Sequence, residues 1–445
     1  MALEKISKST TSNTEKSISE TYESPRWSGE IADCSLPVTL DTYSNCAFGC
    51  VYCFSQYQRG VGGGKDDYFH KQVKSINPEK VKRIFSGEDT ASQFAAYVKD
   101  RRPIQYGGLS DQFDGFERKY GKTYELLTYL KKINYPICFS TKAAWPFFDE
   151  KYRELFRGAD NWNIKFSIIT LDEEAARKIE VGVPSPKKRL EAMREYNKLS
   201  NGGSTLRLRP FIIGLSDKTY LELIRAASEA GATAVTTEFF CLEMRSVNQA
   251  KAHYKVISDV VGFDVVEFYR KHSTGSGYLR LNRKIKEPYI RKMQELCKEL
   301  GLRFYVSDAH FKECSDNCCC CALPPEWEYS RGNFSAALQI AKKTGFVRWK
   351  DVEPDMYFLD SFEWKQAAGF NTFSSEAKAK FAGMTMKDYL HYLWNNPERG
   401  QSPYRMFAGV LVPNGLDENR DIIYRYNENV TFQPITNKAA ELMTL

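Results

Sequence analysis

The run Tyr43-Ser44-Asn45-Cys46-Ala47-Phe48-Gly49-Cys50-Val51-Tyr52-Cys53 carries three cysteines at C-x3-C-x2-C spacing. Three thiolates this close can each bind a different iron of a 4Fe–4S cube, which leaves the fourth iron open to a small molecule. A zinc site would need a fourth ligand in a paired pattern, and the nearest downstream histidine, His70, has no partner. We therefore predict an iron–sulfur site at Cys46, Cys50 and Cys53.

The composition indicates a soluble globular protein that works inside the cell. The 445 residues carry 63 Lys and Arg against 56 Asp and Glu, a formal net charge of +7 that permits a phosphate-rich partner without requiring one. No apolar stretch approaches the roughly 20 residues that span a bilayer, and the N-terminus lacks the apolar core of a signal peptide. We therefore predict a cytoplasmic protein without a membrane partner, whose twelve cysteines indicate metal sites rather than disulfides.

Short β-rich runs alternate with amphipathic helical stretches through the first three quarters of the chain. This alternation predicts βαβ units and a parallel sheet. Six or seven units fit an α/β fold of the partial (β/α)6 barrel type, in which chemistry gathers at the C-terminal ends of the strands. The predicted strands are 37–40, 103–106, 136–140, 163–167, 206–213, 233–237 and 303–306. The predicted helices are 123–133, 188–199, 220–230 and 288–300, the last with Pro288 in its first turn and Gly301 after its end.

Composition changes divide the chain into four predicted regions. Residues 1–30, rich in Ser, Thr, Glu and Lys, read as a flexible leader, and 31–310 as the barrel. Residues 311–325 form a cysteine-rich segment. Residues 326–445 lack clear alternation, apart from a short helix predicted at 384–394, and form an additional α-rich or mixed C-terminal region.

Polar residues follow three of the predicted strands, where the mouth of a barrel would lie. Glycines let backbone approach a ligand closely, and a lysine at a strand end can pair with a carboxylate. Taken singly, such residues are more often turn, cap or surface residues, but their order along the chain is informative. They are Gly107-Gly108-Leu109-Ser110-Asp111, Ser140-Thr141-Lys142, and Phe166-Ser167, with Glu180 and Arg189 further on.

The cysteine loop resembles that of radical S-adenosylmethionine (SAM) enzymes. The strand-end residues follow the same order as in the spore photoproduct lyase, or photolyase-like, branch over roughly residues 36–240. The resemblance implies a 4Fe–4S cluster whose open iron chelates SAM, and whose electron cleaves SAM to methionine and a 5′-deoxyadenosyl radical. Carried over by position, it places Tyr52 beside the adenine, Ser110, Lys142 and Ser167 in contact with SAM, and Glu180 as a site-shaping acid.

One departure from that branch concerns the substrate. The lyases that repair the spore thymine dimer carry a cysteine in the turn before Ser-Asp, which returns a hydrogen atom to the product radical. Gly108 and Leu109 stand there in this chain, and Cys138 lies inside a predicted strand, where we expect burial. We therefore predict a substrate other than the thymine dimer.

A second cysteine run, Cys314-Ser315-Asp316-Asn317-Cys318-Cys319-Cys320-Cys321, suggests another metal site. Cys314, Cys318 and Cys321 repeat the C-x3-C-x2-C spacing, which favours a second Fe–S cluster. Zinc, with His310 as a further ligand, is an alternative. Adjacent cysteines point in different directions, so all five cannot bind one metal.

These features predict a radical SAM enzyme that abstracts hydrogen from a substrate, with an electron donor such as flavodoxin or ferredoxin. Arg207 and Arg209 share one face of a predicted strand, which favours an anionic substrate such as a nucleic acid or nucleotide. A peptide-modifying radical SAM enzyme with an auxiliary cluster is an alternative. A non-catalytic, metal-stabilised nucleic-acid-binding protein is another.

Overall fold

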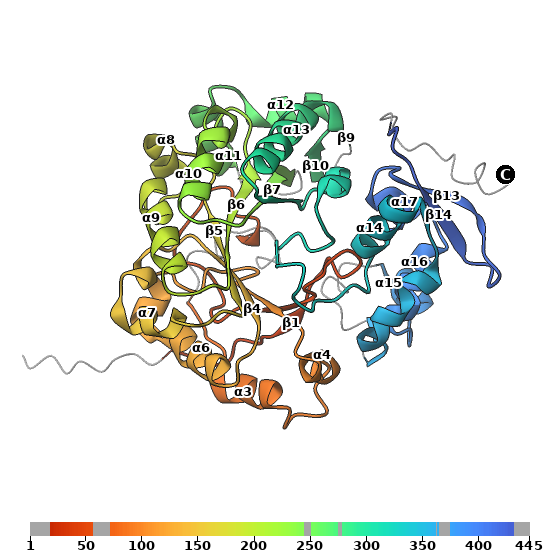
Figure 1. Ribbon diagram of the computed structural model, residues 1–445, viewed down its shortest axis with the longest axis horizontal. Helices are drawn as coiled ribbons and strands as arrows, with labels where there is room; N and C mark the ends of the chain where they lie inside the picture. Colours follow the sequence, from red (N-terminus) through yellow and green to blue (C-terminus); the bar gives the residue numbers. More distant parts are fainter. Residues whose placement is uncertain are drawn as a thin grey trace, which may run out of the picture.

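The computed structural model describes residues 18–56, 72–243, 251–274, 278–361, 363–364 and 374–430. An eight-stranded sheet in the order β1-β2-β3-β4-β5-β6-β7-β11 forms its centre (Figure 1). Its strands are β1 (Arg26–Trp27), β2 (Val38–Leu40), β3 (Ile104–Tyr106), β4 (Ile137–Thr141), β5 (Trp162–Ser167), β6 (Ser204–Phe211), β7 (Ala234–Phe239) and β11 (Arg303–Val306).

The sheet is parallel from β2 to β11, and only β1 runs antiparallel to its neighbour. Its two edges, β1 and β11, do not pair, so the sheet stays open as the sequence predicted. All seven predicted strands are present, with ends that differ by a few residues. Parallel strands all end at the same edge, so the residues that follow β2 to β7 meet there.

Helices from the crossover connections cover the outer face of this sheet (Figure 1). They are α3 (Pro78–Ser86), α4 (Ala95–Lys99), α5 (Gly115–Tyr120), α6 (Lys122–Lys132), α7 (Glu150–Phe156), α8 (Glu173–Ile179), α9 (Pro186–Asn197), α10 (Tyr220–Glu229) and α13 (Arg283–Glu299). Apolar strand residues face them: Tyr106, Phe139, Ile164, Phe166 and Leu206 are fully buried in one continuous hydrophobic core. Burial of such side chains is worth roughly 1.5–3 kcal/mol each and holds the layers together.

The inner face of the same strands is polar. Since side chains alternate along a strand, each apolar outward residue has polar neighbours pointing the other way. The inner-face residues include Gln105, Cys138, Ser140, Asn163, Lys165, Ser167 and Arg207, which are paired across β3 to β6 in register. A packed core needs no such side chains, so this face is available for chemistry.

Beyond α10, a second small sheet in the order β8-β10-β9 packs with two helices. Its elements are β8 (Cys241–Glu243), β9 (Ser273–Thr274) and β10 (Tyr278–Leu281), with α11 (Lys251–Val261) and α12 (Val265–His272). No helix within the described ranges is long and apolar enough to cross a membrane.

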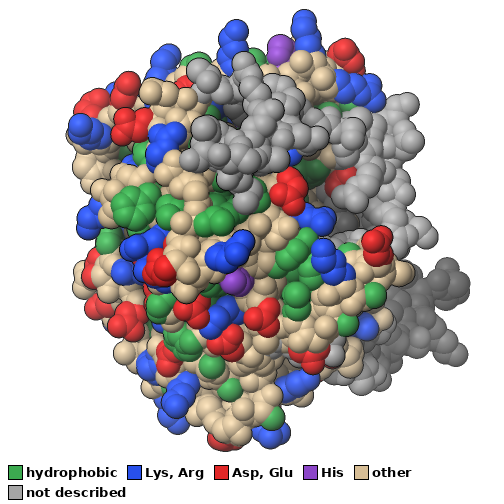
Figure 2. All heavy atoms as spheres, turned by 90° about the vertical axis from the view of Figure 1, so that its right-hand side faces the viewer, with side chains coloured by type: hydrophobic (Ala, Val, Ile, Leu, Met, Phe, Trp, Pro, Cys, Tyr) green, Lys and Arg blue, Asp and Glu red, His purple; other side chains and the backbone are tan. Residues whose placement is uncertain are grey.

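The described part of the C-terminal region is mixed, with helices and a three-stranded sheet in the order β12-β14-β13. It comprises α14 (Phe334–Thr344), β12 (Phe346–Val347), α15 (Ser375–Lys380), α16 (Met386–Trp394), α17 (Pro403–Met406), β13 (Leu411–Leu416) and β14 (Ile422–Tyr426), with short 3-10 turns such as η6 (Glu353–Ser361). Phe358 of η6 stacks on Trp27 of β1 with ring centroids 6.0 Å apart, which joins this region to the edge of the main sheet. On the face that it presents, cations and carboxylates are interspersed with small hydrophobic areas (Figure 2).

Two boundaries differ from the sequence prediction. Residues 1–17 of the predicted leader lie outside the described residues, but Arg26–Trp27 belong to the sheet and Trp27 is 2% exposed, so the ordered fold begins before residue 31. The helix predicted from Pro288 starts at Arg283, because Asn282 caps it through its side-chain oxygen and the Ile285 amide, 3.0 Å apart. Pro288 therefore lies inside the helix. Gly301 does follow the helix end, with a positive φ of 67°.

Candidate active site

The cysteine loop follows β2 and is held in place by its backbone. The Ala47 amide donates to the Asp114 carboxylate over 2.6 Å, and the Gly182 amide donates to the Phe48 carbonyl over 2.9 Å. The Val51 amide donates to the Ile179 carbonyl over 3.0 Å. Two separate segments, one at Asp114 and one at residues 179–182, thus fix the loop between its first and last cysteine.

All three cysteines of the loop are unpaired thiols: Cys50 is buried, and Cys46 and Cys53 are half-buried. Burial, reinforced by the charge of Asp111, raises the pKa of the neighbouring Asp114 to about 7. The loop therefore combines soft sulfur ligands with restricted access of solvent, which suits an iron–sulfur cluster.

Gly182 allows the loop to approach the segment between α8 and α9. A Cβ atom at this position would lie 3.0 Å from the Phe48 carbonyl oxygen, 3.1 Å from the Phe48 Cα and 3.2 Å from the Ala47 carbonyl oxygen. These neighbours are backbone atoms, which cannot rotate away as a flexible side chain could. The sequence singled out Glu180 and Arg189 on either side but carries no signal for Gly182 between them.

Glu180 links the loop to the strand end opposite. Its carboxylate accepts a hydrogen bond from Tyr52 and forms an ion pair of 2.5 Å with Arg189, both members being 1% exposed. Arg189 also donates to the Ser167 carbonyl over 2.6 Å. Glu180 and Arg189 therefore join the cysteine loop to the end of β5.

Lys142 lies beside the thiols at the end of β4. Its amide donates to Asp111 over 2.6 Å, and its ammonium lies 5.5 Å from the centre of the Tyr52 ring. Burial alone would lower the pKa of Lys142, but the charges of Cys50 and Glu180 outweigh it and raise the pKa. The structure thus brings Lys142, Tyr52 and Cys50 together, as the sequence predicted.

The two predicted serines differ in their surroundings. The Ser110 hydroxyl donates to the Asp41 carboxylate over 3.2 Å and to the Tyr43 carbonyl over 3.0 Å, so it braces the start of the cysteine loop. The Ser167 hydroxyl accepts from Arg207 over 3.3 Å on the inner face of the sheet.

Ser140, two residues before Lys142, belongs to the same strand-end motif. Its buried hydroxyl has no hydrogen-bond partner among the described residues. A buried hydroxyl without a partner is costly, and such groups commonly face a ligand that the protein binds. Ser140 therefore fits a bound polar cofactor on the inner face.

The structure places Cys314 apart from the other cysteines of the second run. Cys314 belongs to the main core, and Arg291 approaches its sulfur at 3.6 Å. Cys318, Cys319 and Cys321 belong instead to a separate buried cluster that contains Cys138 of β4. The spacing missed this because it compares cysteines along the chain, whereas the chain turns between Cys314 and Cys318.

Cys321 lies across the inner face of the sheet. Its sulfur is 3.0 Å from the Lys165 ammonium, and its carbonyl accepts from Asn163 over 3.4 Å. Hydrogen bonds from Cys138, Cys319 and Cys320, assisted by Lys165, lower the pKa of Cys321 well below its ordinary value. We call Cys138, Cys319, Cys320 and Cys321 the inner thiol group.

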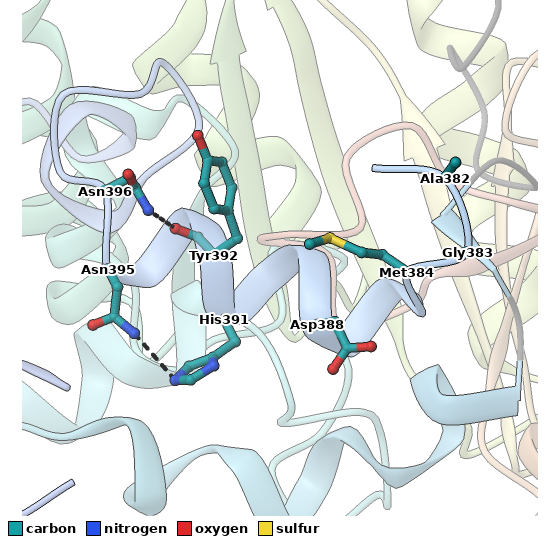
Figure 3. A pocket seen from close by; sticks show the side chains of 8 residues that line it. All are labelled: Ala382, Gly383, Met384, Asp388, His391, Tyr392, Asn395 and Asn396. Carbon is teal, nitrogen blue, oxygen red and sulfur yellow. Dashed lines mark hydrogen bonds between the residues drawn. The ribbon is translucent and has the colours of Figure 1, made fainter. Parts of the chain in front are cut away.

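Among the described residues, no three His, Cys, Asp or Glu side chains are arranged around a single ion. In an Fe–S cluster each thiolate binds its own iron, so the sulfurs do not need to converge on one point. A pocket of about 540 Å³ lies elsewhere, along α16 in the C-terminal region (Figure 3). Beside it, the His391 Nε2 atom lies 2.6 Å from the Asp421 carboxylate, and the Asn395 side-chain amide donates to the same carboxylate over 2.7 Å.

Comparisons with known proteins give only distant similarities. No protein-family model matches the chain. No curated protein matches it. A mutant of spore photoproduct lyase is 17% identical over 65% of this chain and 80% of that chain, with a TM-score of 0.46. SuiB from Streptococcus suis is 14% identical over 62% of this chain and 51% of its own, with a TM-score of 0.38. The radical SAM methyltransferase TsrM from Kitasatospora setae is 12% identical over 48% of this chain and 37% of its own, with a TM-score of 0.33.

Replacing Gly182 with alanine should displace the cysteine loop and weaken its hold on iron. Overpacking of this kind costs about 1–3 kcal/mol, and here the strain falls on the backbone of the loop itself. Iron per chain, measured after anaerobic reconstitution and desalting, should fall at least about twofold. Gly400→Ala is the matched control, because no atom lies within 4 Å of the Cβ position there. Equal iron in both variants would contradict the role assigned to Gly182.

Proposed function

We propose that this chain is a radical SAM enzyme in which Cys46, Cys50 and Cys53 hold a 4Fe–4S cluster with one open iron. The observation that carries this proposal is the clamped loop of three thiols beside the Lys142 ammonium. A structural zinc site would need a fourth ligand and would have no use for an adjacent half-buried cation. When bound, the cluster would supply the electron that cleaves SAM to methionine and a 5′-deoxyadenosyl radical.

Residues at the strand ends support a SAM site beside this loop. Lys142 provides a cation for the SAM carboxylate, and the aromatic face of Tyr52 lies next to it for the adenine. Ser140 and Ser167 present hydroxyls on the same inner face. Ser110 is already engaged with Asp41, so we propose that it shapes the site from behind rather than binding SAM through its hydroxyl.

Arg207 supports an anionic substrate. Its half-buried guanidinium donates to Ser167, and no carboxylate forms an ion pair with it among the described residues, whereas Arg209 pairs with Glu238. Burial, together with the charge of Arg209, lowers the pKa of Arg207 to about 10. A phosphate or carboxylate of the substrate would relieve this unbalanced charge. We propose that the anion is a phosphate of a nucleotide or nucleic acid. The alternative is a carboxylate of a peptide substrate.

We also propose a second Fe–S cluster, bound by the inner thiol group rather than by Cys314. This group supplies four sulfurs, one of them from the barrel strand β4, and Lys165 offers a balancing positive charge. A second cluster here would face the same inner side of the sheet as Arg207.

Anaerobic protein mixed with SAM and dithionite should release 5′-deoxyadenosine, measured by liquid chromatography. Cys46→Ala should reduce this product to background, since a cube held by two thiolates is poorly retained. Cys297→Ala is the control, because Cys297 is a buried core thiol of α13. A wild-type protein that is colourless and forms no 5′-deoxyadenosine would contradict the proposed function and favour a structural metal protein.

Iron and zinc content should distinguish the two assignments of the second site. We expect Cys138→Ala and Cys321→Ala each to lower iron by about four atoms per chain, while Cys314→Ala leaves it unchanged. Loss of iron from Cys314→Ala but not from Cys138→Ala would restore the ligand set predicted from the spacing. If the wild type contained zinc in place of the four iron atoms assigned to the second site, the second Fe–S cluster would be refuted.

A further inference from the structure

The segment that joins β1 to β2 brings one more cysteine, Cys34, to the inner thiol group. Cys34 is a half-buried free thiol that packs against the buried cluster containing Cys138, Cys319 and Cys321. Burial, followed by the charge of Cys321, raises the pKa of Cys34, so the two sulfurs are neighbours. The sequence placed Cys34 in no motif, because it stands alone in its part of the chain.

The residues on either side of Cys34 are fixed to the segment that carries the second cysteine run. The Asp33 carboxylate pairs with the Lys312 ammonium at 3.1 Å, and their side chains are 16% and 5% exposed. The Ser35 hydroxyl donates to the Cys318 carbonyl over 2.9 Å, within the interior. One contact precedes Cys34 and the other follows it, so the backbone holds this thiol beside the cysteine run.

Cys319, Cys320 and Cys321 share one tight turn. The Ala322 amide donates to the Cys319 carbonyl over 2.9 Å, and the Thr236 hydroxyl of β7 donates to the Cys320 carbonyl over 2.8 Å. Ligand runs of Fe–S clusters separate their cysteines by about two or more residues, as in C-x2-C, and often add a distant cysteine. Three consecutive residues do not meet this pattern, so a ligand from another segment is needed.

We propose that Cys34 is this ligand and that it binds the second Fe–S cluster together with Cys138 and Cys321. The inference rests on the proposed function, since it needs a cluster at the inner thiol group. The three ligands come from the β1–β2 segment, from β4 and from the turn, so they approach from three separate parts of the fold. Binding replaces the Sγ–H bond of Cys34 with an S–Fe bond and releases the proton to solvent, with no change in the oxidation state of the sulfur.

Iron content of variants tests the ligand role of Cys34. Cys34→Ala and Cys34→Ser should each lower iron by about four atoms per chain after anaerobic reconstitution, as expected for Cys321→Ala, because a cluster that lacks one thiolate is poorly retained. Cys241→Ala is the matched control and should keep the iron of the wild type. Cys241, in β8, is also a half-buried free thiol, and its sulfur lies 3.6 Å from the Phe239 carbonyl. Equal melting temperatures of the iron-free variants check that each one folds.

A second measurement uses the unaltered chain. Iodoacetamide should alkylate Cys34 at least about fivefold faster after a chelator has removed the iron than in the reconstituted protein, because a thiolate bound to iron is not free to react. Cys241 should be alkylated at the same rate in both states. Peptide mass spectrometry measures the two sites in one sample.

The outcomes separate this inference from the proposals on which it rests. Iron that falls in Cys321→Ala but stays at the wild-type level in both Cys34 variants would overturn the ligand role of Cys34, as would equal alkylation of Cys34 in both states. Iron that falls in none of these variants would instead refute the second cluster. A wild type that binds no iron would refute the proposed function.

Discussion

The buried ion pair between Glu180 and Arg189 organises both sides of the candidate site. Each member is 1% exposed, and the Glu180 carboxylate also accepts from Tyr52 of the cysteine loop. Arg189 binds the carbonyl of Ser167 at the end of β5. Removing one member of such a pair typically costs about 3–5 kcal/mol, because the other charge is left buried alone. The ion pair therefore fixes the position of the cysteine loop relative to the end of β5.

A polar inner face follows from the same architecture. Parallel strands are usually apolar on both faces, since helices cover both. Here the helices cover the outer face, and the segment carrying Cys321 crosses part of the inner one. Lys165 is balanced by Cys321 and Arg209 by Glu238, while Arg207 has no such partner among the described residues. This local imbalance is the reason why we propose an anionic substrate.

The sequence was most informative where structure depends on neighbours along the chain. All seven parallel strands and the helix at Met386–Trp394 arose from local apolar patterns with flanking Gly, Pro or polar residues. The start of α13 was misplaced because Pro288 suggested a first turn, while Asn282 supplies the actual cap. Lys142 and Tyr52 were found because each stands within a short motif.

Local sequence patterns could not predict contacts between residues that lie far apart in the chain. Asp114 and Gly182 clamp the cysteine loop from segments far away in the chain, and neither lies within a motif. The inner thiol group joins Cys138 to cysteines some 180 positions later, with the Cys138 sulfur 3.7 Å from the Cys321 carbonyl. Spacing alone favoured Cys314, which the turn of the chain carries into a different core. Which residues meet at these sites depends on the tertiary fold and not on local helix or strand propensity.

Electron paramagnetic resonance of the reduced protein, recorded with and without SAM, tests the central claim most directly. If Cys46, Cys50 and Cys53 hold a cube with one open iron beside Lys142, dithionite should produce the signal of a reduced 4Fe–4S cluster. Adding SAM should shift its g values, and Cys46→Ala should lack this SAM-sensitive signal. A signal that SAM leaves unchanged, or no iron–sulfur signal in the wild type, would contradict the account.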